Sequence, residues 1–240
     1  MNKALVVVTG ASSGIGAEIA KRFSKAGHPL LLLARRVERI EALGLPNAIA
    51  TKLDIRDKEA FKKAIEDAEK IYGPVDCLIN NAGLMQLGDI STQDPQEWQN
   101  MFDINVIALM NGMQAVLPDM RSRKSGTIIN VSSVAGRKTF VQHAAYCGTK
   151  FAVHAISEAL REEISKDNVR VITIAPGVTE TELLSHTSSE QIKENYLVWK
   201  ESIGGAISAD DVARSTLFAY QQPQNVCIRE IVIAPTRQLQ

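Results

Sequence analysis

Short apolar runs alternate along the chain with longer segments in which apolar and polar residues recur at helical spacing. Several short runs are almost wholly apolar and rich in β-branched residues, as in parallel strands covered on both faces. The pattern predicts strands at residues 4–9, 30–34, 48–53, 75–80, 127–131, 169–175 and 230–233. It predicts helices at residues 15–26, 58–72, 97–120, 145–165 and 210–220. This alternation indicates βαβ units, and hence an α/β fold with a doubly wound parallel sheet and helices on both faces.

The 240 residues fit a single domain, residues 1–240, because no repeat, low-complexity stretch or linker interrupts the alternation. The least patterned stretch is residues 179–205, a polar insertion that contains Tyr196 and Trp199 and ends in Gly204-Gly205. A long irregular segment within a compact domain is typically a lid or a binding element. We expect residues 179–205, called the lid segment below, to close over a substrate.

Composition excludes several classes of partner. Lys plus Arg and Asp plus Glu number 27 each, so the formal charge is zero, which argues against a nucleic-acid or membrane-surface binder. The three cysteines are odd in number and widely spaced, and the four histidines have no metal-ligand spacing, so we expect neither disulfides nor a metal site. No apolar run approaches the ~20 residues that span a bilayer. These features predict a soluble protein of the reducing cytoplasm.

A glycine-rich turn follows the first predicted strand and precedes the first predicted helix. Its spacing is Gly-x-x-x-Gly-x-Gly, and free N–H groups at the start of a helix attract anions. A tight structural turn is the alternative interpretation. If the turn binds a dinucleotide pyrophosphate, the contacting residues are Gly10, Ser12, Ser13, Gly14, Ile15 and Gly16.

The end of the second predicted strand indicates which dinucleotide binds. Enzymes that prefer NAD place a carboxylate there for the ribose 2′-hydroxyl, and those that prefer NADP place arginine for the 2′-phosphate. This chain has Arg35 and Arg36, with no acid before Glu38. The sequence therefore predicts NADP as the cofactor, with NAD less favoured.

Tyr146 and Lys150 lie four residues apart in a predicted helix and therefore share one of its faces. A neighbouring ammonium lowers a phenol pKa, which suits general acid–base catalysis near neutral pH. A surface tyrosine beside a surface lysine is the alternative. Ser133, just after a predicted strand, and Asn105, inside a predicted helix where asparagine is disfavoured, are further candidates.

Taken together, these motifs resemble the short-chain dehydrogenase/reductase family over essentially the whole chain, which implies a Rossmann-type fold. The resemblance implies that Tyr146 transfers a proton, Lys150 binds the nicotinamide ribose, Ser133 polarises the carbonyl and Asn105 holds a relay water. It also implies a homotetramer formed through the predicted helices 97–120 and 145–165. The further cofactor contacts that it implies are Asp54 and Ile55 at the adenine, Asn81, Ala82 and Gly83 at the adenosine ribose, and Pro176, Gly177, Thr179 and Thr181 at the nicotinamide and phosphates.

The resulting hypothesis is an NADP(H)-dependent oxidoreductase that interconverts a small or medium carbonyl compound and its alcohol. The alternatives are a 3-oxoacyl carrier-protein reductase, for which Arg137 and Lys138 give a slight basic signal, and a non-catalytic NADP(H)-binding regulator. The substrate is not readable from the sequence. Besides the lid segment, the predicted pocket residues are Leu84, Met85, Val134, Phe140, Val141 and His143.

Overall fold

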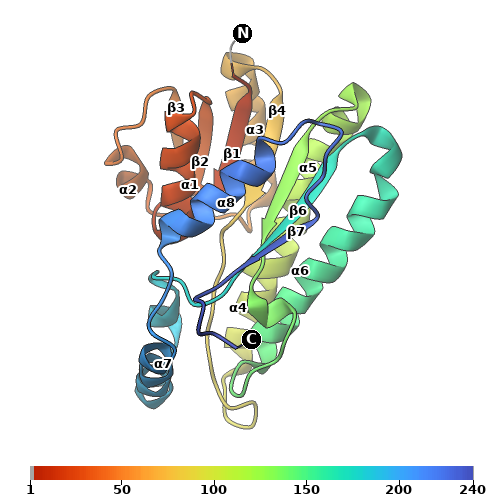
Figure 1. Ribbon diagram of the computed structural model, residues 1–240. Coiled ribbons are helices and arrows are strands. Elements are labelled where there is room, and N and C mark those ends of the chain that lie inside the picture. Colours follow the sequence, from red (N-terminus) through yellow and green to blue (C-terminus); the bar gives the residue numbers. More distant parts are fainter. Residues whose placement is uncertain (1–2, 240) are drawn as a thin grey trace.

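A computed structural model describes residues 3–239, which contain one sheet of seven parallel strands in the order β3-β2-β1-β4-β5-β6-β7 (Figure 1). The predicted α/β fold with a doubly wound parallel sheet is confirmed. Each predicted strand is present with bounds that differ by at most one residue. The strands are β1 (Leu5–Thr9), β2 (Leu30–Ala34), β3 (Ala48–Lys52), β4 (Val75–Asn80), β5 (Thr127–Val131), β6 (Arg170–Pro176) and β7 (Glu230–Ile233).

Alternate residues of each central strand enter two separate cores. In β1, Val6 and Val8 pack on one side of the sheet with α1 (Gly14–Lys25) and α8 (Ala209–Tyr220). Leu5 and Val7 pack on the other side, with α3 (Lys58–Tyr72), α5 (Ala108–Arg123) and α6 (Ala144–Glu163). Both faces of the central strands are therefore excluded from water, which explains why their sequences are continuous apolar runs. None of the helices within residues 3–239 is long and apolar enough to cross a membrane.

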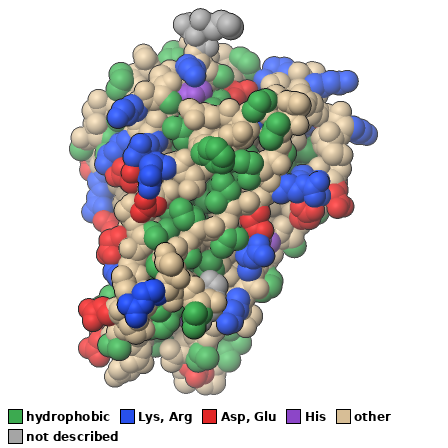
Figure 2. All heavy atoms as spheres, viewed as in Figure 1, with side chains coloured by type: hydrophobic (Ala, Val, Ile, Leu, Met, Phe, Trp, Pro, Cys, Tyr) green, Lys and Arg blue, Asp and Glu red, His purple; other side chains and the backbone are tan. Residues whose placement is uncertain are grey.

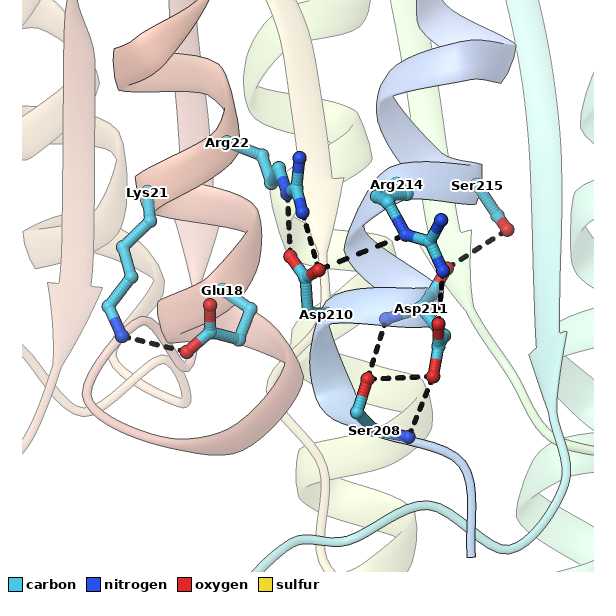
Figure 3. Close-up of polar contacts among 8 residues, drawn as sticks. All are labelled: Glu18, Lys21, Arg22, Ser208, Asp210, Asp211, Arg214 and Ser215. Carbon is cyan, nitrogen blue, oxygen red and sulfur yellow. Dashed lines mark hydrogen bonds and ion pairs between the residues drawn. The ribbon is translucent and has the colours of Figure 1, made fainter.

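Polar contacts fix the pairing of α1 with α8 at the outer surface (Figure 3). Arg22 of α1 donates from Nε and Nη2 to the two carboxylate oxygens of Asp210, both at 2.5 Å. Ser208 and Asp211 form a reciprocal capping box at the start of α8, which satisfies backbone N–H groups of the first turn. The bidentate pair joins the first βαβ unit to the last helix.

The predicted helix 97–120 is present within an uninterrupted helical run of residues 95–123, but its winding changes along the way. The run consists of α4 (Pro95–Phe102), a π-helical turn (Asp103–Ile107) and α5. The buried side chain of Asn105 bonds to the backbone of Leu84, and the wider turn brings it there. Such π-helical turns occur often at functional sites.

Two further helices were not predicted. The short α2 (Val37–Glu41) follows β2, and α7 (Glu190–Ser202) forms about half of the lid segment. No residue of α7 is buried, but Ile192, Tyr196 and Trp199 recur at helical spacing and are half-buried on the side that lines the cavity. Figure 1 shows α7 projecting beyond the sheet.

Candidate active site

One cavity of about 630 Å³ runs along the carboxyl ends of the strands and under the lid segment. The strand order reverses between β1 and β4, and in open α/β sheets this is where ligands bind. The cavity is lined by all of the predicted pocket residues and by all but two of the predicted site residues. The two exceptions, Gly16 and Asn105, are not among its lining residues.

The glycine-rich turn needs glycine for two different reasons. Gly10 and Gly14 have φ angles of +68° and +51°, which favour residues without a side chain. Gly16 lies so close to the turn that an added Cβ would sit 2.3 Å from the carbonyl oxygen of Gly10. The turn is therefore closely packed, with Ser12 and Ser13 on the cavity wall.

The end of β4 holds this turn in place. The hydroxyl of Thr9 accepts hydrogen bonds from the backbone N–H groups of Asn81 and Ala82, each at 3.0 Å. The Asn81 side chain donates to the carbonyl oxygen of Thr9 at 2.9 Å. Asn81 thus supports the turn with its side chain, while Gly83 leaves open the space beside Asn105 and Lys150.

Charged side chains gather at the ends of β2 and β3. Arg36 donates from Nη2 to the hydroxyl of Ser13 at 3.0 Å, and the same nitrogen lies 2.9 Å from a carboxylate oxygen of Glu182. The other oxygen of Glu182 lies 2.7 Å from Arg39 Nη1. Sequence reasoning missed Arg39 and Glu182, because no local pattern connects α2 with the lid segment.

Asp54 and Ile55 line the cavity after β3, as does Arg35 after β2. Asp54 forms an ion pair with Arg56 at 2.6 Å. The hydrogen bond from Arg56 lowers the pKa of Asp54. The carboxylate is thus ionised and fixed in position at the edge of the site.

Tyr146 and Lys150 lie buried on one face of α6, at 5% and 6% exposure. Lys150 Nζ is 5.8 Å from the centre of the Tyr146 ring and donates to the carbonyl oxygen of Val131 at 3.1 Å. Burial lowers the pKa of Lys150 to about 8. Burial also raises the pKa of Tyr146, and the nearby Ser133 hydroxyl opposes that rise.

The direction of the Tyr146 shift differs from the sequence-based expectation. The i, i+4 spacing brings the ammonium within 5.8 Å of the ring centre, but desolvation is the largest cause of the shift in the Tyr146 pKa because the phenol is enclosed by protein. Tyr146 is consequently a protonated phenol at neutral pH. That form can donate a proton.

Asn105 ties the loop after β4 to α6. Its Nδ2 donates to the carbonyl oxygen of Leu84 at 2.8 Å and to Thr149 Oγ1 at 3.0 Å. Its Oδ1 accepts from the N–H of Leu84 at 2.8 Å. An added Cβ on Gly83 would lie 3.5 Å from Asn105 Oδ1 and 3.8 Å from Lys150 Nζ, so both polar atoms border the same small space.

Aromatic rings form the wall of the cavity near Tyr146. His143 contacts Phe140 at 5.5 Å and Tyr196 at 6.3 Å between ring centres. Trp199 contacts Tyr196 at 5.4 Å and Phe140 at 6.5 Å, so the four rings form a closed circuit. Burial lowers the pKa of His143, which keeps this ring neutral. The wall suits a partly hydrophobic substrate.

The strand end at β6 is closed by a residue from the C-terminal segment. Gln238 accepts the N–H of Val178 at 2.9 Å, and a Cβ on Gly177 would lie 2.3 Å from its Oε1. Pro176, Thr179 and Thr181 line the cavity beside it. Sequence reasoning missed Gln238, and no motif marks it.

Comparison with known proteins shows which proteins this chain is similar to. A family model described as short chain dehydrogenase matches residues 4–192. An uncharacterized oxidoreductase of Staphylococcus saprophyticus is 40% identical, over 98% of this chain and 96% of the relative. One of Listeria monocytogenes is 37% identical, over 98% and 97%. The closed form of a serine dehydrogenase complexed with NADP+ superposes with a TM-score of 0.89 at 29% identity, covering 98% of this chain and 96% of that one.

Proposed function

Because the chain belongs to the short chain dehydrogenase family and is an oxidoreductase, we propose that it reduces a small or medium carbonyl compound to its alcohol with NADPH, or runs the reverse reaction with NADP+. One observation carries the proposal. The buried Tyr146 and Lys150 line the same cavity as a glycine turn suited to a pyrophosphate. When bound, NADPH supplies the hydride.

In this proposal the residues of the chain transfer the proton, orient the carbonyl and bind the cofactor. Tyr146, held in its neutral form by burial, donates its proton to the carbonyl oxygen as that oxygen gains negative charge. Ser133 orients the same oxygen with its hydroxyl. Lys150 presents an ammonium to the nicotinamide ribose, and Asn105 offers its Oδ1 to a water in the space beside Gly83. The aromatic wall positions the rest of the substrate.

Replacement of Tyr146 by phenylalanine tests the enzyme class. We expect the rate of NADPH consumption with a panel of aldehydes, ketones, 3-oxo esters and hydroxy acids to fall by about 10²–10⁴-fold, since the proton donor is lost. Binding of NADPH, followed by its fluorescence, changes little. A non-catalytic regulator predicts no turnover in the wild type either, and that result refutes the proposal.

Cofactor preference is tested at the end of β2. Arg35 and Arg36 line the cavity, and no carboxylate of β2 itself is available for a ribose hydroxyl. Replacing both arginines with alanine should weaken NADPH binding far more than NADH binding. Equal loss for the two cofactors contradicts the proposed preference.

A 3-oxoacyl carrier-protein reductase remains the alternative substrate assignment. An acidic carrier calls for free basic groups at the mouth of the cavity. Arg137 forms an ion pair with Glu230, which weakens the basic signal of Arg137 and Lys138. Activity on an acyl carrier thioester well above that on free small ketones would favour this alternative.

Association into a homotetramer is supported by two exposed apolar surfaces. Phe102, Ile107, Met110 and Phe151 are exposed on α4, the π-helical turn, α5 and α6. Figure 2 shows hydrophobic side chains across the face made by α8 and β7, where Phe218 and Val232 are 57% and 46% exposed. Contiguous exposed apolar surfaces mark sites of protein–protein contact. Sedimentation velocity measures the resulting mass.

A further inference from the structure

A carboxylate of the lid segment sits in an anion site at the adenosine end of the cavity. Glu182 gives one oxygen to Arg36, at 2.9 Å, and the other to Arg39, at 2.7 Å. Arg36 reaches Ser13 as well, so two guanidinium groups and a hydroxyl of the cavity wall meet at this place. The guanidinium groups lower the pKa of Glu182, which is therefore charged at neutral pH.

This anion site coincides with the place that the proposed function gives to the cofactor 2′-phosphate. Arg36 follows β2 and Ser13 precedes α1, the two elements between which a ribose phosphate would lie. A phosphate monoester carries about −1.5 to −2 charges and three acceptor oxygens, more than one carboxylate offers. The two anions repel each other, so a phosphate that binds Arg36 and Arg39 drives Glu182 away.

Resting on the proposed function, we propose that Glu182 is an internal competitor for the 2′-phosphate site and a determinant of cofactor specificity. It weakens NADP(H) binding and ties the lid segment to α2 until the phosphate displaces it. NADH lacks this phosphate and leaves both ion pairs intact. Arg39 then joins Arg36 as a phosphate-binding residue.

The neighbours of Glu182 connect this exchange to the rest of the site. The side chain of Thr181 lies across the glycine turn, 3.1 Å from where a Cβ of Gly14 would be. Leu183 packs in the apolar cluster that contains Tyr146 and Tyr196. Release of Glu182 therefore frees a segment that touches both the pyrophosphate turn and the substrate wall.

The size of the effect follows from the exposure of the pairs. The side chains of Arg36, Arg39 and Glu182 are 43%, 45% and 47% exposed. Exposed ion pairs are weak, so the phosphate can readily replace Glu182. Removing the competing charge should therefore tighten the binding of ligands with a 2′-phosphate by roughly 2- to 30-fold.

Calorimetric titration of Glu182→Gln tests the competition. The ligands are NADPH and NADH, together with the fragments adenosine 2′,5′-bisphosphate and adenosine 5′-monophosphate. We expect tighter binding of the two ligands that carry a 2′-phosphate and changes below about twofold for the other two. The matched control is Glu158→Gln, because Glu158 is paired with Arg161 on α6, does not line the cavity and should leave all four affinities unchanged.

A fluorescence measurement tests the coupling to the lid segment. Trp98 and Trp199 are the two tryptophans, so Trp98→Phe leaves Trp199 of α7 as the reporter. Adenosine 2′,5′-bisphosphate should change the emission of Trp199, whereas adenosine 5′-monophosphate should not. In Glu182→Gln the two fragments should give the same Trp199 response.

The outcomes separate the two proposals. If Glu182→Gln changes the affinity for all four ligands equally, or does not tighten the binding of the ligands with a 2′-phosphate, the role of Glu182 is refuted. The proposed function then still stands. An identical Trp199 response to both fragments overturns the coupling. A wild-type protein that binds neither dinucleotide overturns the proposed function itself.

Discussion

Replacing Lys150 by methionine measures how much the buried ammonium lowers the free energy of unfolding. Lys150 is buried, and burial lowers its pKa from 10.5 to about 8. The difference between these two values is about 2.5, and each pKa unit corresponds to 1.36 kcal/mol. Holding the ammonium in the folded protein therefore costs about 3 kcal/mol below pH 8.

Methionine removes this cost but also loses the hydrogen bond from Nζ to the carbonyl oxygen of Val131. A bond of this kind contributes about 1 kcal/mol. The variant should therefore be about 2 kcal/mol more stable at pH 7, a rise in melting temperature of about 4–8 °C for a protein of this size. It should also lose reductase activity.

The difference in stability between the wild type and Lys150→Met depends on pH. Between about pH 8 and pH 10.5 the unfolded wild type binds more protons at this lysine than the folded protein does, so its stability rises with pH relative to the variant. The advantage of Lys150→Met should be full below pH 8, should pass through zero between pH 8 and pH 10.5, and should become a deficit of about 1 kcal/mol above that, because the lost hydrogen bond remains.

Urea denaturation at a series of pH values, without added cofactor, measures the difference. Lys62→Met is the matched control, because Lys62 is 60% exposed on α3 and should change stability by less than about 0.5 kcal/mol at every pH. The reasoning would be refuted if Lys150→Met were less stable than the wild type at pH 7, or if the difference in their free energies of unfolding did not change with pH.

Three further substitutions test the architecture of the site. Gly16→Ala forces a Cβ against the carbonyl oxygen of Gly10, so urea denaturation should show a loss of about 1–3 kcal/mol and nucleotide titration should show weakened binding. Asn105→Ala leaves the part-buried N–H and C=O of Leu84 without their partner, which should cost about 1–3 kcal/mol and reduce kcat more than NADPH affinity. Trp199→Ala removes part of the substrate wall, so steady-state kinetics should show KM raised by about 10-fold with little change in kcat.

The sheet was readable from the sequence because its strands are covered on both faces. Leu30–Ala34 is buried throughout, so its sequence is a continuous apolar run. The π-helical turn within the predicted helix 97–120 was not readable. It depends on Asn105 reaching Leu84, a contact 21 residues away that helical periodicity does not encode.

Several parts of the site depend on contacts between distant segments. The ends of parallel strands meet at one edge, so Gly10, Arg36 and Ser133 could be grouped from the strand pattern alone. The ion pair of Arg39 with Glu182 joins residues 143 positions apart. Contacts of this kind carry no local signal.

Burial also determines the direction in which the pKa of Tyr146 shifts, which the i, i+4 spacing alone did not predict correctly. An i, i+4 cation argues for a lowered phenol pKa, and the enclosed environment reverses the sign at Tyr146. The same desolvation moves Lys150 toward its neutral form. Tyr146 is thus uncharged at neutral pH, whereas Lys150, with a pKa of about 8, keeps most of its charge there. A neutral phenol is a proton donor, whereas alcohol oxidation requires the phenolate. The phenol of the free protein is therefore in the form that the proposed carbonyl reduction needs.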